Sequence, residues 1–260
     1  MASAWSRFKK LASKVNQLGQ PPKPGAHHPD AWMWRYAKAP LDSNVTRLMS
    51  LAGVLNEDNG MPVNIVDPRK PKATAQAWLG EWWGVGSATE ARHQLDSLID
   101  EGHGPVLDEA HRLAFERQPH AIETLGRYFP QWPAGDLEEF YGYVPGARTA
   151  LAELSFMAID APPITTKAYD IGRCITVARM CAAAGYLQDD DVLHVAHRAG
   201  RVAMELFSGW PEYALSYVLG RGIWGGDSEL LRSQIEIARM YLEHDASPWL
   251  TAGWLRPDEL

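Results

Sequence analysis

The strongest constraint in this sequence is the stretch at residues 168–224, which is typical of three helices with sharp stops between them. In the first helix, apolar residues recur at intervals of three and four, which places them on one helical face. Gly185 ends that helix, Asp189 can cap the next, and Pro211 suits the first turn of the third. A chain with three such helices in succession must build its core from packed helices. The apolar face of the first helix consists of Ile171, Cys174, Ile175, Ala178, Cys181 and Ala182.

Helical patterns also dominate the remainder of the chain. Ser87 and Glu90 have the spacing of a capping box at the start of a helix. Only residues 63–66 resemble a strand, and they lie among turn-forming residues in a predicted loop at residues 56–72. The sequence therefore predicts an all-α fold, an irregular multi-helix globular domain with an N-terminal helical arm.

We expect three parts along the chain. Residues 1–72 form a helical arm with Pro-rich linkers, residues 73–245 form the helical core, and residues 246–260 form a tail that packs loosely. Within the arm, residues 1–18 have the spacing of a basic amphipathic helix, and residues 19–30 are a Pro-rich linker that contains His27 and His28.

Composition limits the possible functions. The formal net charge of −7 argues against a general nucleic-acid binder, which needs a basic surface. No apolar run is long enough to span a membrane, and the N-terminus does not resemble a secretory signal. Cys174 and Cys181 lie about 10 Å apart along one helix, too far for a disulfide. We therefore expect a cytoplasmic protein that has inert, packed thiols and binds no cofactor.

Several short motifs occur in a particular order. They are Trp82-Trp83, Leu95-x-x-Leu98-x-x-x-Gly102-His103, Tyr169-Asp170-Ile171-Gly172-Arg173, Gly185-Tyr186-Leu187, Trp210 and Ser216-Tyr217-x-x-Gly220-Arg221-x-x-Trp224. In their order and spacing, residues 75–227 resemble the DUF1266 family of bacterial proteins. The chain departs from that family at Tyr169, where Trp is usual, and at Gly104, where a basic residue is common. The family has no settled activity, but some similar proteins occur beside secreted toxins, so the resemblance implies an immunity role.

Four polar residues of these motifs are candidates for a site: His103, Asp170, Arg173 and Arg221. One interpretation gathers them into a polar pocket that binds a charged ligand or catalyses a reaction, with the two arginines as anion anchors. The alternative is a buried charge network that fixes the helix register, and we favour it because Asp, Arg, Gly and Trp together usually specify packing.

A metal site is a weaker possibility. Asp190, His194 and His197 are spaced at four and three residues, so they share a helical face. His27 and His28 are adjacent histidines in a predicted linker, and such pairs usually have no ligand role. Since no further ligand is marked by the sequence, we expect no bound metal.

Acidic clusters point to a protein partner. Charge runs are usually solvated faces, but acidic residues interleaved with Trp and Tyr suit a basic partner. We therefore predict a cytosolic immunity protein that neutralises a basic toxin domain by stoichiometric binding. The alternatives are an enzyme or small-ligand binder that uses the polar cluster, and a structural scaffold component. The candidate contact residues are Glu138, Glu139, Asp189, Asp190 and Asp191.

Overall fold

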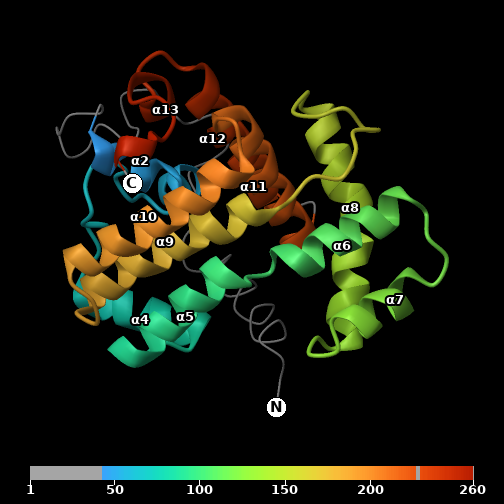
Figure 1. The fold of residues 1–260 in the computed structure, drawn as a ribbon, viewed down its shortest axis with the longest axis horizontal. Helices are drawn as coiled ribbons and strands as arrows, with labels where there is room; N and C mark the ends of the chain where they lie inside the picture. Colours follow the sequence, from blue (N-terminus) through green and yellow to red (C-terminus); the bar gives the residue numbers. More distant parts are fainter. Residues whose placement is uncertain (1–42, 227–228, 260) are drawn as a thin grey trace.

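The computed structural model describes residues 43–226 and 229–259, and every regular element in these ranges is helical. The predicted all-α fold is therefore confirmed (Figure 1). None of these helices is both long and apolar enough to cross a membrane. The predictions for residues 1–18 and 19–30 lie outside the described residues.

In chain order the helices are α2 (Asn44–Ser50), α3 (Gly53–Asp58), α4 (Lys72–Trp83), α5 (Ala88–Asp100), α6 (Gly104–Phe115), α7 (Ala121–Tyr128), α8 (Ala134–Glu153), α9 (Lys167–Ala184), α10 (Asp189–Leu206), α11 (Trp210–Gly225), α12 (Glu229–Glu243), α13 (Pro248–Thr251) and the 3-10 helix η3 (Pro257–Glu259).

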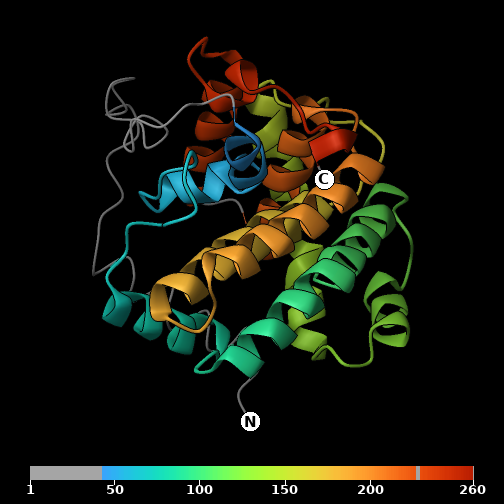
Figure 2. The same ribbon diagram turned by 60° about the vertical axis from the view of Figure 1, so that its left-hand side comes forward.

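Helix α9 is the centre of the fold. It packs against α10, α11, α4 and α5, and both ribbon views show it between these helices (Figures 1 and 2). Every residue at positions 168–181 is buried, so α9 has no solvent face. The sequence predicted one apolar face, and the difference arises because other helices cover α9 on all sides. Its polar side chains must therefore find partners inside the protein.

Helices α6, α7 and α8 pack together and join the remainder of the protein mainly through α11 (Figure 1). Two glycines on α11 permit this close packing. A Cβ at Gly220 would lie 2.8 Å from Cβ of Tyr169 on α9, and a Cβ at Gly222 would lie 2.7 Å from Cβ of Ala147 on α8. The two positions face opposite sides of the helix. The Gly220-Arg221-Gly222 motif thus lets α11 fit between α9 and α8.

Residues 61–68 form the predicted loop, but the strand-like piece at residues 63–66 is irregular and the loop is largely buried. Arg179, which is fully buried on α9, donates hydrogen bonds to the backbone carbonyls of Pro62 (2.5 Å) and Val66 (2.9 Å). These carbonyls point toward a side chain instead of a neighbouring strand, so no sheet forms in this segment.

One hydrophobic core continues on both sides of residue 72. Leu48 and Val63, from the segment before α4, are fully buried in the same cluster as Leu79 of α4. Helix α2 packs against α10, and α3 packs against α9 and α12. The three-part division of the chain at residues 72 and 245 stays a prediction.

The C-terminal tail does not pack loosely, as the sequence had led us to expect. Trp249 is 1% exposed, and its ring stacks on that of Trp210 with the centroids 4.7 Å apart and the planes 5° apart. Trp249 Nε1 also donates to the carbonyl of Ser50 (3.0 Å). Arg47 donates to the carbonyl of Ala252 (2.9 Å). The tail is thus part of the core, because the rings of two distant tryptophans meet there.

We expect Trp249→Ala to lower the free energy of unfolding by about 3–5 kcal/mol, because it removes a buried ring and its hydrogen bond. Leu250→Ala is the matched control, since Leu250 is the next residue and is 48% exposed. The control should lose less than about 1 kcal/mol. Urea unfolding of both variants tests this, and equal losses would show that the tail contributes little.

Candidate functional site

Asp170 lies in the first turn of α9, yet its carboxylate binds the start of another helix. It is 1% exposed, and Oδ2 accepts hydrogen bonds from the backbone N–H groups of His103 (2.9 Å) and Gly104 (2.8 Å). These two N–H groups open α6. Arg173, one turn further along α9, donates to Oδ1 of the same carboxylate. Asp170 therefore caps α6 from the side of α9.

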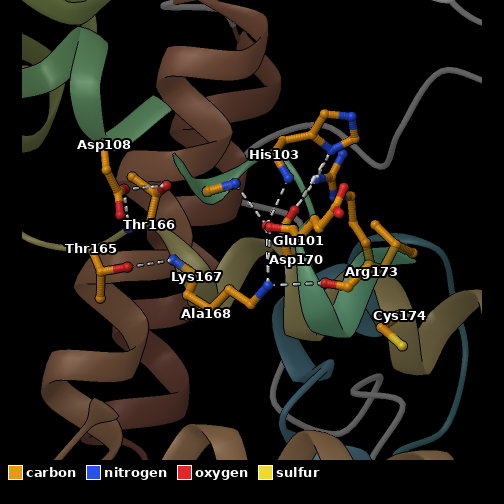
Figure 3. A network of polar contacts seen from close by, with 12 residues as sticks. Glu101, His103, Asp108, Thr165, Thr166, Lys167, Ala168, Asp170, Arg173 and Cys174 are labelled. Atoms are coloured by element: carbon orange, nitrogen blue, oxygen red, sulfur yellow. Dashed lines mark hydrogen bonds and ion pairs between the residues drawn. The ribbon is translucent and has the colours of Figure 1, made fainter. Parts of the chain in front are cut away.

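Asp108 of α6 makes the reverse contact. Its Oδ1 accepts hydrogen bonds from the backbone N–H (2.6 Å) and the hydroxyl (2.7 Å) of Thr166, the residue that precedes α9. The carboxylate of each helix thus caps the N-terminus of the other, as Figure 3 shows. The hydroxyl of Thr166 donates to Asp108, while Thr165 Oγ1 accepts from the backbone N–H of Lys167 (3.2 Å), the first residue of α9.

A third helix end joins this arrangement through Lys167. Its Nζ donates to the carbonyls of Leu98 (3.1 Å) and Glu101 (3.3 Å) at the end of α5, and it lies 3.9 Å from Oδ2 of Asp170 (Figure 3). A cation at a helix C-terminus is favourable because the last carbonyls are unpaired and the dipole is negative there. We call His103, Asp108, Lys167, Asp170 and Arg173 the α6–α9 cluster.

Aromatic rings enclose the cationic side of this cluster. The guanidinium carbon of Arg173 lies 4.2 Å from the ring centroid of Tyr169 and 5.2 Å from that of Trp224. The His103 ring lies 4.3 Å from Trp224 and 5.4 Å from Trp132, measured between centroids. These faces stabilise the guanidinium and exclude water from its ion pair.

The charges in the cluster shift the pKa values of its members. Burial alone would raise the pKa of Asp170, but Arg173, His103 and Lys167 outweigh it and hold that pKa well below its ordinary value. Burial and the charge of Arg173 lower the pKa of His103 to about 4, although Asp170 opposes this. Burial raises the pKa of Asp108. At neutral pH the Asp170 carboxylate is therefore ionised and His103 is neutral.

The cluster brings together three of the four residues that the sequence singled out. Nδ1 of His103 lies 2.5 Å from Arg173 Nη2 and 3.6 Å from Asp170 Oδ1. In the described ranges, no hydrogen bond or ion pair joins Arg221 to these residues. Instead its guanidinium lies against the last turn of its own helix, where a Cβ at Gly225 would be 1.8 Å from Nη1.

The sequence left two alternatives open, a ligand-binding pocket and a buried charge network. The observed geometry matches the buried charge network. The sequence analysis did not identify Asp108 and Lys167 as members of the site, because no local pattern links them to partners about 60 residues away along the chain. The alternative of a catalytic cluster stays a hypothesis. An ionised carboxylate whose pKa is depressed is a poor proton acceptor, so any catalytic role for Asp170 would be electrostatic.

Residues 43–226 and 229–259 contain no group of three or more His, Cys, Asp or Glu side chains that could together hold a metal ion. Asp190 and His194 are exposed and His197 is half-buried on α10. The expectation of no bound metal stays a prediction.

The acidic candidates for a protein contact form two separate surfaces. Asp189 and Asp190 are exposed at the start of α10, while Glu138 is exposed near the start of α8 and Glu139 is half-buried beside it. Figure 1 places the α9–α10 turn at the left of the molecule and α8 at the right.

Asp191 also has a structural role at the start of α10. It accepts from the backbone N–H of Gln188 (2.9 Å) in a capping box, and it lies 3.8 Å from Arg92. Its charge is therefore less available to a partner than those of its two neighbours.

A second buried histidine lies on α6 at His111, which has no exposed surface. Its Nε2 is 2.5 Å from Arg148 Nη1, and Nη2 of the same arginine donates to the carbonyl of Ala161 (2.8 Å). Burial and the charge of Arg148 lower the pKa of His111 to about 4.

We expect Gly102→Ala to destabilise the fold more than Gly84→Ala. Both glycines have left-handed backbones, with φ of +64° and +66°, so both variants carry the same strain of about 1 kcal/mol. Only a Cβ at Gly102 would meet Asp170, at 2.0 Å from Oδ2, whereas nothing lies within 4 Å of one at Gly84. Urea unfolding tests the difference, and equal losses would contradict the tight fit of Asp170 against α6.

Acidification should destabilise the fold through His111. Its folded pKa of about 4 lies below the ordinary value near 6.5, so between these values only the unfolded chain binds the proton. The free energy of unfolding should thus fall by about 1.4 kcal/mol per pH unit from this group as pH drops from 6.5 to 4. His111→Gln should flatten the slope by that amount in urea melts at a series of pH values. Parallel slopes would contradict a buried neutral His111.

Residues 78–254 match the model of a family described as "Protein of unknown function (DUF1266)". No curated protein and no solved structure matches the chain. The matched range covers more than half of the 260 residues and contains the whole α6–α9 cluster. The chain therefore belongs to the DUF1266 family.

Proposed function

We propose that this chain binds a basic protein partner, and that it acts as an immunity protein that neutralises a cognate bacterial toxin by stoichiometric binding. The observation that carries the proposal is the distribution of charge. Among the described residues, five arginines are buried but only two acidic side chains, Asp136 and Asp170. Because the net charge is already −7, burying more cations than anions leaves the surface more acidic still. The buried arginines are Arg47, Arg148, Arg173, Arg179 and Arg221.

An acidic surface favours a basic partner mainly by raising the rate of association. Opposite charges raise the association rate, and salt weakens this effect because screening shortens its reach to about 8 Å at physiological ionic strength. Apolar and aromatic contacts then slow dissociation. The two exposed acidic surfaces, at the starts of α8 and α10, are placed to steer such a partner.

We also propose the cytosol as the compartment. Cys174 and Cys181 are both free and buried, and burial raises the pKa of Cys181 to about 12. Thiols packed in this way suit a reducing environment, since neither has a disulfide role.

One observation supports the second candidate, a binder of a small anionic ligand. Nε of Arg173 and Nη1 of Arg221 are buried, and in the described part of the chain neither has a hydrogen-bond partner. Unpaired buried donors are costly, and an anion that reached either guanidinium would satisfy its donor. The scaffold alternative has no such supporting observation.

Co-expression with the product of the neighbouring gene tests the proposal. We expect that product to be toxic alone and harmless with this chain, and the two proteins to co-elute in gel filtration. The association rate should fall several-fold between low and high salt, because steering is screened.

Charge reversal extends this test to the surface. Asp189→Lys with Asp190→Lys, or Glu138→Lys, should slow association if that surface lies near the contact, while Asp191 is left intact for its capping role. A neighbouring product that is harmless alone, or that kills equally in the presence of this chain, would refute the immunity role and favour the ligand-binding candidate.

A further inference from the structure

Two shallow grooves meet on the outer side of the α6–α9 cluster. The first, of about 360 Å³, lies between α6, the end of α7 and residues 163–165. The second, of about 400 Å³, lies between the end of α5, the start of α6 and the end of α10. They share Pro105, Asp108 and Thr165, so they form one continuous surface, which we call the α6 groove.

Each end of the α6 groove exposes a large apolar side chain. Tyr128, in the first groove, is 63% exposed, and Leu206, in the second, is 46% exposed. Phe129 and Ile164 line the wall beside Tyr128, and Val202 lines the wall beside Leu206. Single exposed apolar residues are ordinary, but apolar side chains that line a hollow mark a contact surface.

The charge available in the α6 groove is negative. Arg112, one of its two bases, is held by Glu109 (Nε to Oε2, 2.8 Å) and by Glu116. The other base, Lys167, donates to backbone carbonyls at the end of α5. Glu101 is exposed, and none of the described residues forms an ion pair with its side chain. The acidic residues along the groove are Asp100, Glu101, Asp108 and Glu109; Asp100 pairs with Arg198 (3.4 Å), Glu109 with Arg112, and Asp108 accepts hydrogen bonds from Thr166, so the charge available to a partner is mainly that of Glu101.

We propose that the α6 groove receives an extended segment of the basic partner protein. A lysine or arginine of that segment binds above Glu101 and Asp108, and apolar side chains on either side pack against Leu206 and Tyr128. Glu101 and Asp108 both line the second groove, together with Lys167. This inference rests on the proposed function and assigns its contact surface.

The α6 groove combines an acidic side chain, Glu101, with exposed apolar side chains, and it is separate from the other acidic candidates. Neither Glu138 and Glu139 nor residues 189–191 line either groove. Exposed charges steer a partner at long range, whereas apolar contacts in a groove slow dissociation. We therefore assign steering to the acidic residues at the starts of α8 and α10, and docking to the α6 groove.

A peptide experiment tests the groove without any knowledge of the natural partner. The probes are a short synthetic peptide of alternating leucine and lysine, and the same peptide with glutamate in place of lysine. We expect the lysine peptide alone to shift the backbone amide NMR signals of the groove, including those of Asp108, Thr165 and Leu206. Shifts confined to another surface, or equal shifts with both peptides, would overturn the proposal.

Paired variants separate groove contacts from overall charge. Glu101→Lys should weaken peptide binding about tenfold, the scale of a truncated contact residue. Glu243→Lys changes the net charge equally at an exposed position on α12 and should have little effect. Leu206→Glu and Leu250→Glu form a second pair, since the two leucines are 46% and 48% exposed. Equal weakening within either pair would contradict a specific groove.

Co-expression then distinguishes this inference from the proposed function. If the native chain protects against the neighbouring toxin and Glu101→Lys with Leu206→Glu abolishes protection, the groove is the docking surface. If that double variant folds and protects fully, the groove assignment fails while the immunity role stands. If the native chain does not protect, the immunity role fails, and the peptide experiment decides by itself whether the groove binds basic segments.

Discussion

Two carboxylates that cap each other's helices hold the middle of this fold together. Asp170 of α9 satisfies the first N–H groups of α6, and Asp108 of α6 satisfies the residue that opens α9. Both helix starts are shielded from water, so their N–H groups depend on these contacts. Because Lys167 adds the end of α5, the directions of three helices are fixed at one place. Helices α4, α10 and α11 pack around α9, whose direction this junction helps to set.

Features that depend on neighbouring residues were predictable from the sequence, and features that join distant residues were not. Gly185, with φ of +81°, ends α9 as expected, and Ser87 Oγ accepts from Glu90 N–H (3.2 Å) in the predicted capping box. Periodicity showed an apolar face on α9 but could not show that its other faces are covered too. His103, Asp170 and Arg173 were grouped because they are polar residues of the short ordered motifs, whereas Asp108 has no sequence signal because its partner is Thr166, 58 residues away.

The buried arginines connect the packing to the proposed function. Arg47, Arg148 and Arg179 each donate to backbone carbonyls of irregular segments, to residues such as Ala252, Ala161 and Pro62. Carbonyl acceptors supply hydrogen bonds that a buried cation needs, so the burial of these arginines depends less on acidic side chains. The acidic residues therefore remain at the surface, and the requirement to fasten irregular segments also makes the exterior acidic.

The contact between Asp170 and α6 has unequal tolerance to mutation at its two ends. The donors at His103 and Gly104 are main-chain groups, so a side-chain replacement there leaves the hydrogen bonds in place, except for proline, which has no N–H. A Cβ at Gly104 would lie 3.3 Å from Oδ2, which a small adjustment can accommodate. The position of Gly104 can therefore accept a small side chain, while the acceptor at Asp170 and the glycine before His103 can change very little.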